Sequence, residues 1–328
     1  MAENQIVLDI QDLTVYYETD AGVAKAVNEL NLTLKKGRTI GLVGETGSGK
    51  TTTALSVLRL VPDPPGVIKS GRILLDGVDI LSLSEREMDR KIRGTEVSMI
   101  FQDPMTSLNP VMTVGHQIAE VIYTHNHDIS KRAAEEKAGE LLELVGISAS
   151  RAGQYPHQFS GGMKQRVIIA IALACNPKIL IADEPTTALD VTIQAQILDV
   201  IRELRDRLDM SMIMITHDLG IVAEICDEVS IIYAGRIVEH GSVQEVFRHP
   251  LHPYTEGLFR SLPHINDDRE MLVPIPGMMP DPMELPVGCA FCPRCAYAMD
   301  RCSKEIPETT LVNGSHTIAC YRRQGSDV

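Results

Sequence analysis

A glycine-rich segment near the start of the chain has the composition and spacing of a phosphate-binding loop. Residues 44–51 read GETGSGKT and fit the pattern G-x-x-x-x-G-K-[ST]. The glycines let successive backbone N–H groups point at phosphate oxygens, and Lys50 would reach the β- and γ-phosphates. The Thr51 hydroxyl would ligate Mg²⁺, with the dipole of the following helix adding to the attraction. The pattern predicts ATP and Mg²⁺ as ligands, against the alternative of a glycine-rich turn without a ligand.

Two carboxylates follow a short apolar run further along the chain. Residues 178–182 read KILIA and precede Asp183 and Glu184. Open α/β sheets place their chemistry at the carboxyl ends of strands. Asp183 suits a water-bridged contact to Mg²⁺, and Glu184 would position or deprotonate the water that attacks the γ-phosphorus. Without the phosphate loop, two acidic caps of the next helix would be the better interpretation.

A third motif, residues 159–166, reads FSGGMKQR. A serine and bare backbone at a helix start form an anion site, although an ordinary N-cap with glycines is the alternative. The motif resembles the signature of ABC ATPases. That resemblance implies that Ser160, Gly161 and Gly162 bind the γ-phosphate of a partner subunit across a dimer. Met163 stands where the family usually has glutamine, so that one side-chain contact is not carried over.

The remaining positions of the ABC family occur in order along the chain. The resemblance implies that Tyr17 stacks on adenine, with Tyr16 as its rival because adjacent strand residues face opposite ways. Gln102 would sense Mg²⁺ and water, Asp190 belongs to the D-loop, and His217 would hold the γ-phosphate. Glu184, His217 and Gln102 are thus the expected catalytic residues, and Thr51, Gln102 and Asp183 the expected Mg²⁺ ligands. The full expected nucleotide site comprises Tyr17, Gly44, Glu45, Thr46, Gly47, Ser48, Gly49, Lys50, Thr51, Thr52, Gln102, Ser160, Gly161, Gly162, Asp183, Asp190 and His217.

The elements that must position these motifs alternate between strand and helix. Residues 39–43 form an apolar run before the phosphate loop, and a helical pattern runs from Lys50 to about residue 60. Two more buried strands are expected at 179–182 and 212–216. The helix between them would present one apolar face, formed by Ile197, Leu198, Ile201, Leu204 and Leu208. This alternation predicts a parallel sheet.

The rest of the chain divides into an insert, a hairpin and a tail. Apolar residues spaced three or four apart predict a helical insert between Gln102 and Gln165, and residues 229–239 read as a hairpin. Past residue 253 repeated prolines favour an extended arm. We expect an α/β fold of the ABC-type P-loop NTPase class, with a RecA-like mixed sheet, an antiparallel β edge and a helical subdomain at about 103–165. The expected domains are a nucleotide-binding domain at 1–252 and a C-terminal, cysteine-rich extension at 253–328.

Longer segments narrow the resemblance within the ABC family. Residues 99–110, 155–158, 182–196 and 252–255 look like the D-type ATPases of oligopeptide and dipeptide importers, and the similarity covers nearly the whole chain. The resemblance implies ATP hydrolysis in a composite dimer site that powers peptide import. It also implies two integral membrane permease subunits, a peptide-binding protein, and either a paralogous ATPase or a second copy of this chain. The chain would then lie at the cytoplasmic face of the cell membrane, and other subunits would choose the peptide.

Five of the seven cysteines crowd between Cys289 and Cys320. In a reducing cytoplasm such a group favours metal over disulfides. Spacing alone would nominate the C-x₂-C-x₂-C run that includes Cys292, whereas the importer resemblance implies a [4Fe–4S] cluster on Cys289, Cys295, Cys302 and Cys320. A structural zinc site, or reduced cysteines that pack a small subdomain, are the alternatives.

Composition excludes several other classes of protein. A net charge of −13 argues against holding nucleic acid or anionic lipid through bulk electrostatics. The polar, acidic start does not resemble a secretory signal, and no apolar run reaches the ~18 residues of a membrane span. A soluble ABC ATPase of nucleic-acid maintenance would need a longer insert, and a translation factor would need two cassettes. A nucleotide or redox sensor remains as a non-enzymatic alternative.

Overall fold

The computed structural model describes residues 5–102, 107–126, 128–187, 189–261 and 274–323. The chain forms two compact units, each built from several stretches of sequence. Unit 1 comprises Met1–Val7, Leu34–Thr39 and Ser82–Ile215. Unit 2 comprises Leu8–Thr33, Ile40–Leu81 and Thr216–Val328. Within the described ranges, no helix is both long enough and apolar enough to cross a bilayer.

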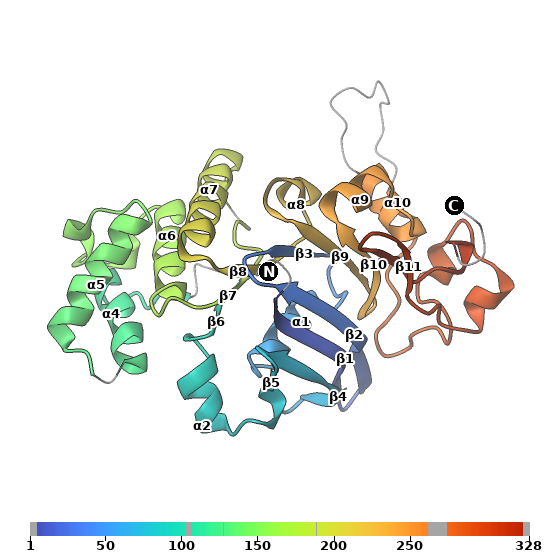
Figure 1. Ribbon diagram of the computed structural model, residues 1–328, viewed down its shortest axis with the longest axis horizontal. Coiled ribbons are helices and arrows are strands. Elements are labelled where there is room, and N and C mark those ends of the chain that lie inside the picture. Colours follow the sequence, from blue (N-terminus) through green and yellow to red (C-terminus); the bar gives the residue numbers. More distant parts are fainter. Residues whose placement is uncertain (1–4, 103–106, 127, 188, 262–273, 324–328) are drawn as a thin grey trace. The chain divides into compact units, whose positions relative to one another are not determined.

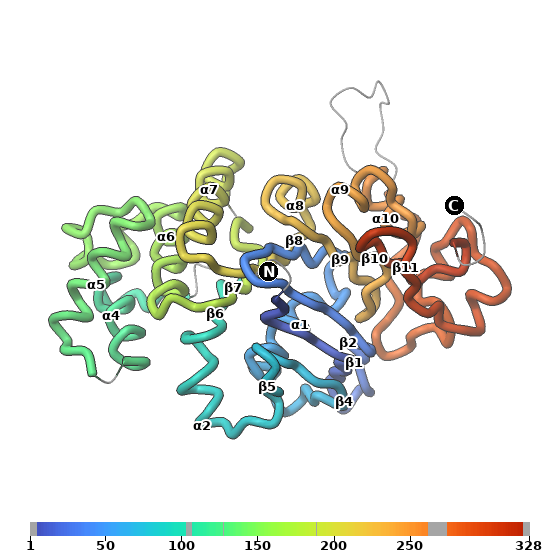
Figure 2. Tube along the Cα trace, in the orientation of Figure 1, coloured from blue at the N-terminus to red at the C-terminus, as the bar shows by residue number. Residues whose placement is uncertain are grey.

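Unit 2 contains a four-stranded sheet in the order β2-β1-β4-β5, whose blue traces run side by side in Figure 2. The pairs β1–β4 and β4–β5 are antiparallel. Leu8 and Ile10 of β1 are buried on either side of the more exposed Asp9, as expected for a strand with one face on the core. The strands are β1 (Ile6–Thr19), β2 (Gly22–Lys35), β4 (Gly66–Leu75) and β5 (Val78–Asp79).

A second set of strands in unit 2 leads to the phosphate loop. The fully buried β3 (Thr39–Val43) pairs in parallel with β9 (Glu228–Tyr233). The predicted hairpin is confirmed, because β9 turns through Ala234 and Gly235 into the antiparallel β10 (Arg236–Ser242). Both turn residues have positive φ, which is typical of a two-residue hairpin turn. Strand β10 also pairs antiparallel with β12 (His316–Ile318). Strand β12 pairs antiparallel in turn with β11 (Thr310–Asn313).

The helices of unit 2 are short, and several begin at side-chain caps. Ser242 and Glu245 form a reciprocal capping box at the start of α9. The helices are α1 (Lys50–Val57), α8 (Leu219–Ile225), α9 (Val243–Arg248) and α10 (Pro253–Arg260). The 3₁₀ turns are η1 (Ile80–Ser82), η5 (Cys292–Arg294), η6 (Asp300–Ser303) and η7 (Tyr321–Arg323).

Unit 1 carries three parallel strands in the order β8-β7-β6. They are β6 (Val97–Ile100), β7 (Ile179–Asp183) and β8 (Ser211–Thr216, within unit 1 as far as Ile215). The predicted crossover helix is present as α7 (Val191–Leu208), with Ile197, Leu198, Ile201 and Leu204 buried. Strand, helix and parallel strand therefore follow one another as the apolar patterns predicted.

The remainder of unit 1 is mainly helical. Helices α4 and α5 lie against each other (Figure 1), and Ala134, Ala138 and Leu142 form the buried face of α5. The segment at 103–106 lies outside the described residues. The helices and turns are α2 (Glu85–Glu87), η2 (Met88–Ile92), α4 (Val114–His125), α5 (Lys131–Leu144), η3 (Ala149–Arg151), η4 (Pro156–Gln158) and α6 (Gly161–Ala172).

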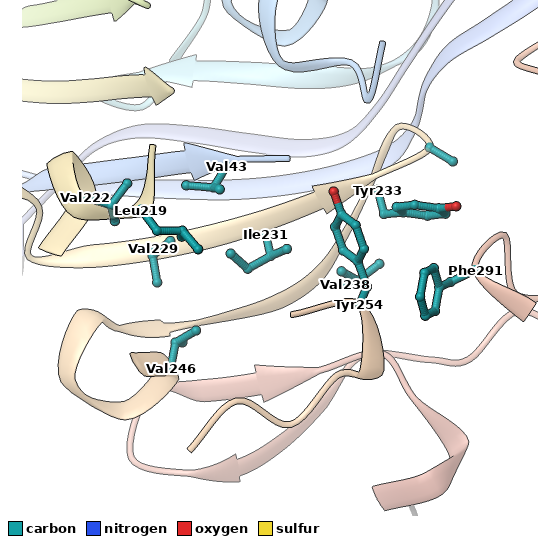
Figure 3. Packing of buried hydrophobic residues seen from close by; sticks show 11 residues of the cluster. Val43, Leu219, Val222, Val229, Ile231, Tyr233, Val238, Val246, Tyr254 and Phe291 are labelled. Carbon is teal, nitrogen blue, oxygen red and sulfur yellow. The ribbon is translucent and has the colours of Figure 1, made fainter. Parts of the chain in front are cut away.

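One hydrophobic cluster of unit 2 joins the strand before the phosphate loop to the cysteine-bearing segment (Figure 3). Val43, at the end of β3, belongs to this cluster together with Tyr233 of β9, Tyr254 of α10 and Phe291. The rings of Tyr233 and Phe291 meet edge to face, with centroids 5.2 Å apart. Aromatic pairs of this kind stabilise a core beyond the area that they bury. Residues near position 290 therefore help to fix the sheet on which the phosphate loop is built.

Candidate nucleotide-binding site

The phosphate loop connects the buried β3 directly to α1. Gly47 and Gly49 have φ of 81° and 105°, a region that favours glycine. A Cβ at Gly44 would lie 2.2 Å from the carbonyl oxygen of Ile232, and one at Gly49 would lie 2.5 Å from that of Ala26. The loop therefore needs glycine at these positions for steric reasons, in addition to any ligand.

Lys50 is held over the loop that precedes it. Its side chain is largely buried, and Nζ donates to the carbonyl oxygens of Gly44 at 2.7 Å and Glu45 at 2.9 Å. The Ser48 hydroxyl is also buried, and it meets no hydrogen-bond partner within the described structure. An ammonium, a spare hydroxyl and a run of backbone N–H groups thus converge in one loop, a donor set that suits a polyphosphate. The residues present fit ATP.

Tyr17 lies beside the helix that leaves the loop. A hydrogen bond of 3.2 Å joins its hydroxyl to that of Thr52, next to the predicted Mg²⁺ ligand Thr51. Tyr16 instead lines a cavity of about 610 Å³ together with Arg236 and His240. The two neighbouring tyrosines therefore face different surroundings, and Tyr17 is the one whose hydroxyl bonds to the loop helix.

In unit 1, Gln102 and Glu184 are in direct contact. Gln102 Nε2 donates to Glu184 Oε2 at 3.1 Å, and the hydroxyl of Thr187 donates to the same oxygen at 3.0 Å. Glu184 has φ of 47°, an unfavourable value for a residue with a side chain. Such strain persists where the surroundings impose it and is common at functional sites. Asp183, one residue earlier, ends β7 and is almost fully buried.

Ser160 and Asp190 both occupy helix N-caps in unit 1. The Ser160 hydroxyl accepts from the N–H of Met163 at the start of α6, and the Asp190 carboxylate accepts from the N–H of Ile193 at the start of α7. Both therefore fill an ordinary capping role, which for Ser160 is the alternative that the sequence also allowed. Ser160 and Gly161 are nevertheless exposed. The free backbone of this helix start is accessible to an anion from another molecule.

His217 is exposed and follows β8 directly. Its neighbour Asp218 caps α8 by accepting from the N–H of Gly220 at 2.8 Å. His217 belongs to unit 2, like the phosphate loop and Tyr17, whereas Gln102, Asp183, Glu184, Ser160 and Asp190 belong to unit 1.

The five clustered cysteines line one small pocket in unit 2, together with His252, Tyr297 and Arg322. Burial raises the pKa of the Cys289 thiol to about 11. Among the residues that the structure describes, no three His, Cys, Asp or Glu side chains are arranged to hold a metal ion. The donor type and the shared pocket suit a soft metal, although the described side chains are not arranged to ligate one.

Sequence reasoning missed two residues that contact the phosphate loop. The hydroxyl of Tyr254 accepts from the N–H of Glu45 at 2.9 Å, and Arg294 forms an ion pair with the Glu45 carboxylate. Tyr254 lies in the segment 252–255, whose resemblance to importer ATPases carried no role with it. Nothing in the sequence pattern marks Arg294, which lies 249 residues away from its partner.

Comparisons with known proteins give consistent matches over nearly the whole chain. The ABC transporter family matches residues 27–187, and the family described as the oligopeptide/dipeptide transporter, C-terminal region, matches residues 238–302. The oligopeptide transport ATP-binding protein OppD of Bacillus subtilis is 51% identical and covers 96% of this chain and 88% of that protein. The dipeptide transport ATP-binding protein DppD of the same organism is 48% identical and covers 96% and 94%, respectively.

Solved structures support the fold independently. A dimeric ATP-binding cassette in a post-hydrolysis state with ADP and phosphate has a TM-score of 0.64 and 25% identity, and covers 72% of this chain and 98% of that chain. The cassette cbiO1 of Clostridium perfringens has the same TM-score with 29% identity, and covers 75% and 92%, respectively. The mixed sheet with helices is therefore the ABC ATPase fold. The chain belongs to the ABC transporter ATPases, among the ATP-binding proteins of the oligopeptide and dipeptide transporters.

Proposed function

We propose that this ATPase powers the import of peptides through separate membrane subunits. The observation that carries the proposal is the match of residues 238–302 to the oligopeptide/dipeptide C-terminal region, combined with relatives named for peptide transport at about half identity. Two permease subunits, a peptide-binding protein and a second ATPase, paralogous or identical, would complete the transporter at the cytoplasmic face of the membrane. The alternative of a soluble ATPase that acts on nucleic acid gains no support from these matches.

The site residues take the following roles in our proposal. The loop backbone and Lys50 bind the phosphates, Tyr17 stacks on adenine, and Thr51, Asp183 and Gln102 would hold Mg²⁺. The ion, when bound, would neutralise charge between the β- and γ-phosphates. Glu184 orients the attacking water and accepts its proton, and its hydrogen bond from Gln102 fixes the carboxylate for that task.

The exposed helix start at Ser160, Gly161 and Gly162 serves the nucleotide of the partner subunit in this proposal. Asp190 lies at the start of the next helix, and His217 would contact the γ-phosphate. A site completed only on dimerisation would couple hydrolysis to the opening and closing of two subunits. The dimeric arrangement of a solved relative supports this reading.

Glu184→Gln tests the assignment of the catalytic base. We expect ATP hydrolysis to fall by at least about a hundredfold, while ATP binding persists and a nucleotide-bound dimer accumulates, because a general base contributes that much. Glu203→Gln is the matched control, since Glu203 is an exposed glutamate of α7. Hydrolysis by Glu184→Gln at the rate of the control would refute the role.

The transport assignment needs a separate experiment. Affinity purification from native membranes should recover two polytopic subunits, and reconstitution with the binding protein should make hydrolysis depend on peptide. Recovery from the soluble fraction with nucleic acid, or hydrolysis indifferent to peptide, would contradict peptide import while leaving the ATPase intact.

We also retain two finer proposals about the C-terminal part. The first is that the chain divides into a nucleotide-binding domain at 1–252 and a C-terminal extension at 253–328. The second is that a [4Fe–4S] cluster, or zinc as the alternative, is bound by Cys289, Cys295, Cys302 and Cys320. The support for a metal is that all five cysteines line one pocket. Iron and sulfide analysis of anaerobically purified protein tests this, with Cys175→Ser as a control outside the group. A protein that contains zinc but no iron would favour the alternative, and one without metal would refute both.

A further inference from the structure

Arg294, in the turn between Cys292 and Cys295, makes an ion pair with the phosphate loop. Its Nη1 lies 3.1 Å from each carboxylate oxygen of Glu45, and only 6% of its side chain is exposed. The same guanidinium donates to the carbonyl oxygen of Pro276 at 2.9 Å and to the hydroxyl of Tyr233 at 3.3 Å. These contacts hold the Arg294 guanidinium independently of Glu45. The geometry of the ion pair is therefore set by the C-terminal segment, residues 274–323.

Two other residues from beyond the hairpin reach the same loop. The fully buried Tyr254 accepts the backbone N–H of Glu45, so Glu45 is held at both its backbone and its side chain. The Tyr254, Tyr233 and Phe291 rings lie close together in Figure 3. The Met279 side chain lies 3.3 Å from the position that a Cβ would take if Gly47 carried one. Residues 274–323 and α10 thus contact the loop at two of its positions.

The ion pair matters for the nucleotide because of where Glu45 lies. The carbonyl oxygen of Glu45 accepts a hydrogen bond from Lys50, so a shift of Glu45 would move the group that positions this ammonium. In addition, an unpaired carboxylate in the loop would repel the triphosphate, and neighbouring charges in a partly buried site are poorly screened. A paired Glu45 avoids both effects.

We propose that Arg294 is a positioning residue of the nucleotide site: it holds and neutralises Glu45, so that the cysteine-bearing segment sets the affinity of the loop for ATP. This inference rests on the proposed assignment of residues 44–51 as the ATP-binding loop. It adds a role for residues that lie outside the cassette motifs and that the sequence pattern does not mark.

Equilibrium binding of a fluorescent ATP analogue to the full chain tests the proposal. Arg294→Met should raise the Kd roughly three- to tenfold, the range expected when a partly buried charge pair is broken. Arg294→Lys keeps the charge but loses the several donors of the guanidinium, so its Kd should lie between those of wild type and Arg294→Met. Arg301→Met is the matched control, since Arg301 pairs with Glu305 in the same segment at an exposed site. Its Kd should equal that of wild type.

The double variant Glu45→Gln with Arg294→Met separates charge neutralisation from folding. Because it removes the unpaired carboxylate, it should bind ATP more tightly than Arg294→Met alone, although it lacks the same arginine. An Arg294→Met Kd equal to that of Arg301→Met would overturn the inference. So would a double variant as weak as Arg294→Met, because the loss would then follow from structural damage.

Lys50→Ala distinguishes this failure from failure of the underlying assignment. If the loop binds ATP, Lys50→Ala loses most of the affinity whatever Arg294 does. Wild-type affinity in Lys50→Ala would refute the loop assignment itself and the inference with it, whereas weak binding in Lys50→Ala with no effect of Arg294→Met would refute the inference alone.

Discussion

Truncation of Phe291 to alanine tests whether the cysteine-bearing segment is part of the core of unit 2. The side chain is 4% exposed, and its ring contacts Tyr233, Tyr254 and His252 at centroid distances of 5.2, 5.5 and 5.8 Å. Removing a fully packed phenylalanine leaves a cavity and costs about 3–5 kcal/mol. Phe291→Leu keeps most of the volume and should cost less than about 1.5 kcal/mol.

Urea unfolding followed by circular dichroism measures this difference. With a urea dependence of about 3 kcal/mol per M, the alanine variant should unfold at a urea concentration lower by about 1–1.7 M. Limited proteolysis should also cut residues 274–323 sooner in Phe291→Ala than in Phe291→Leu, because the ring anchors that segment. A shift below about 0.3 M for Phe291→Ala, equal to that of Phe291→Leu, would show that the segment contributes little to the core.

Three further predictions follow from local geometry. Gly49→Ala should lower ATP affinity by at least about tenfold in a binding assay, because φ of 105° and a backbone contact at 2.5 Å force the loop to move. Tyr17→Ala should weaken ATP binding about tenfold through lost stacking, whereas Tyr17→Phe and Tyr16→Ala should match wild type; equal effects of the two alanine variants would disprove the adenine role. Burial by itself raises the pKa of Glu245, but hydrogen bonds from Ser242 and Ser315 outweigh this effect and lower the pKa to about 2. The carboxylate therefore stabilises the fold above pH 4.5, and about 1 kcal/mol after allowance for solvent screening should be lost as pH falls from 4.5 to 2. Glu245→Gln should show a flatter dependence of unfolding midpoint on pH over that interval.

The local motifs were predictable because each depends on residues close together in the sequence. The phosphate loop needs glycine at fixed positions for steric reasons, and the structure shows those close approaches at Gly44 and Gly49. The crossover helix and its flanking strands follow from hydrophobic periodicity, which does not depend on distant partners. On the expected apolar face Ile197, Leu198, Ile201 and Leu204 are buried, and Leu208 at the helix end is half-buried.

The cysteine group shows the limit of reasoning from spacing. Five cysteines within 32 residues predicted a metal centre, and all five do line one pocket. Ligation also requires thiolates aimed at one point, which spacing does not specify. The observed geometry offers no such group within the described residues.

The sequence alone determined the family, the phosphate loop, the two carboxylates at the end of β7 and the helix start at Ser160, because these features arise from short-range patterns. Only the tertiary structure decided which tyrosine contacts the loop helix, that Gln102 donates to Glu184, and that Arg294 pairs with Glu45. These contacts join residues between 35 and 249 positions apart. They depend on how strands and loops pack together, and no local periodicity encodes that packing.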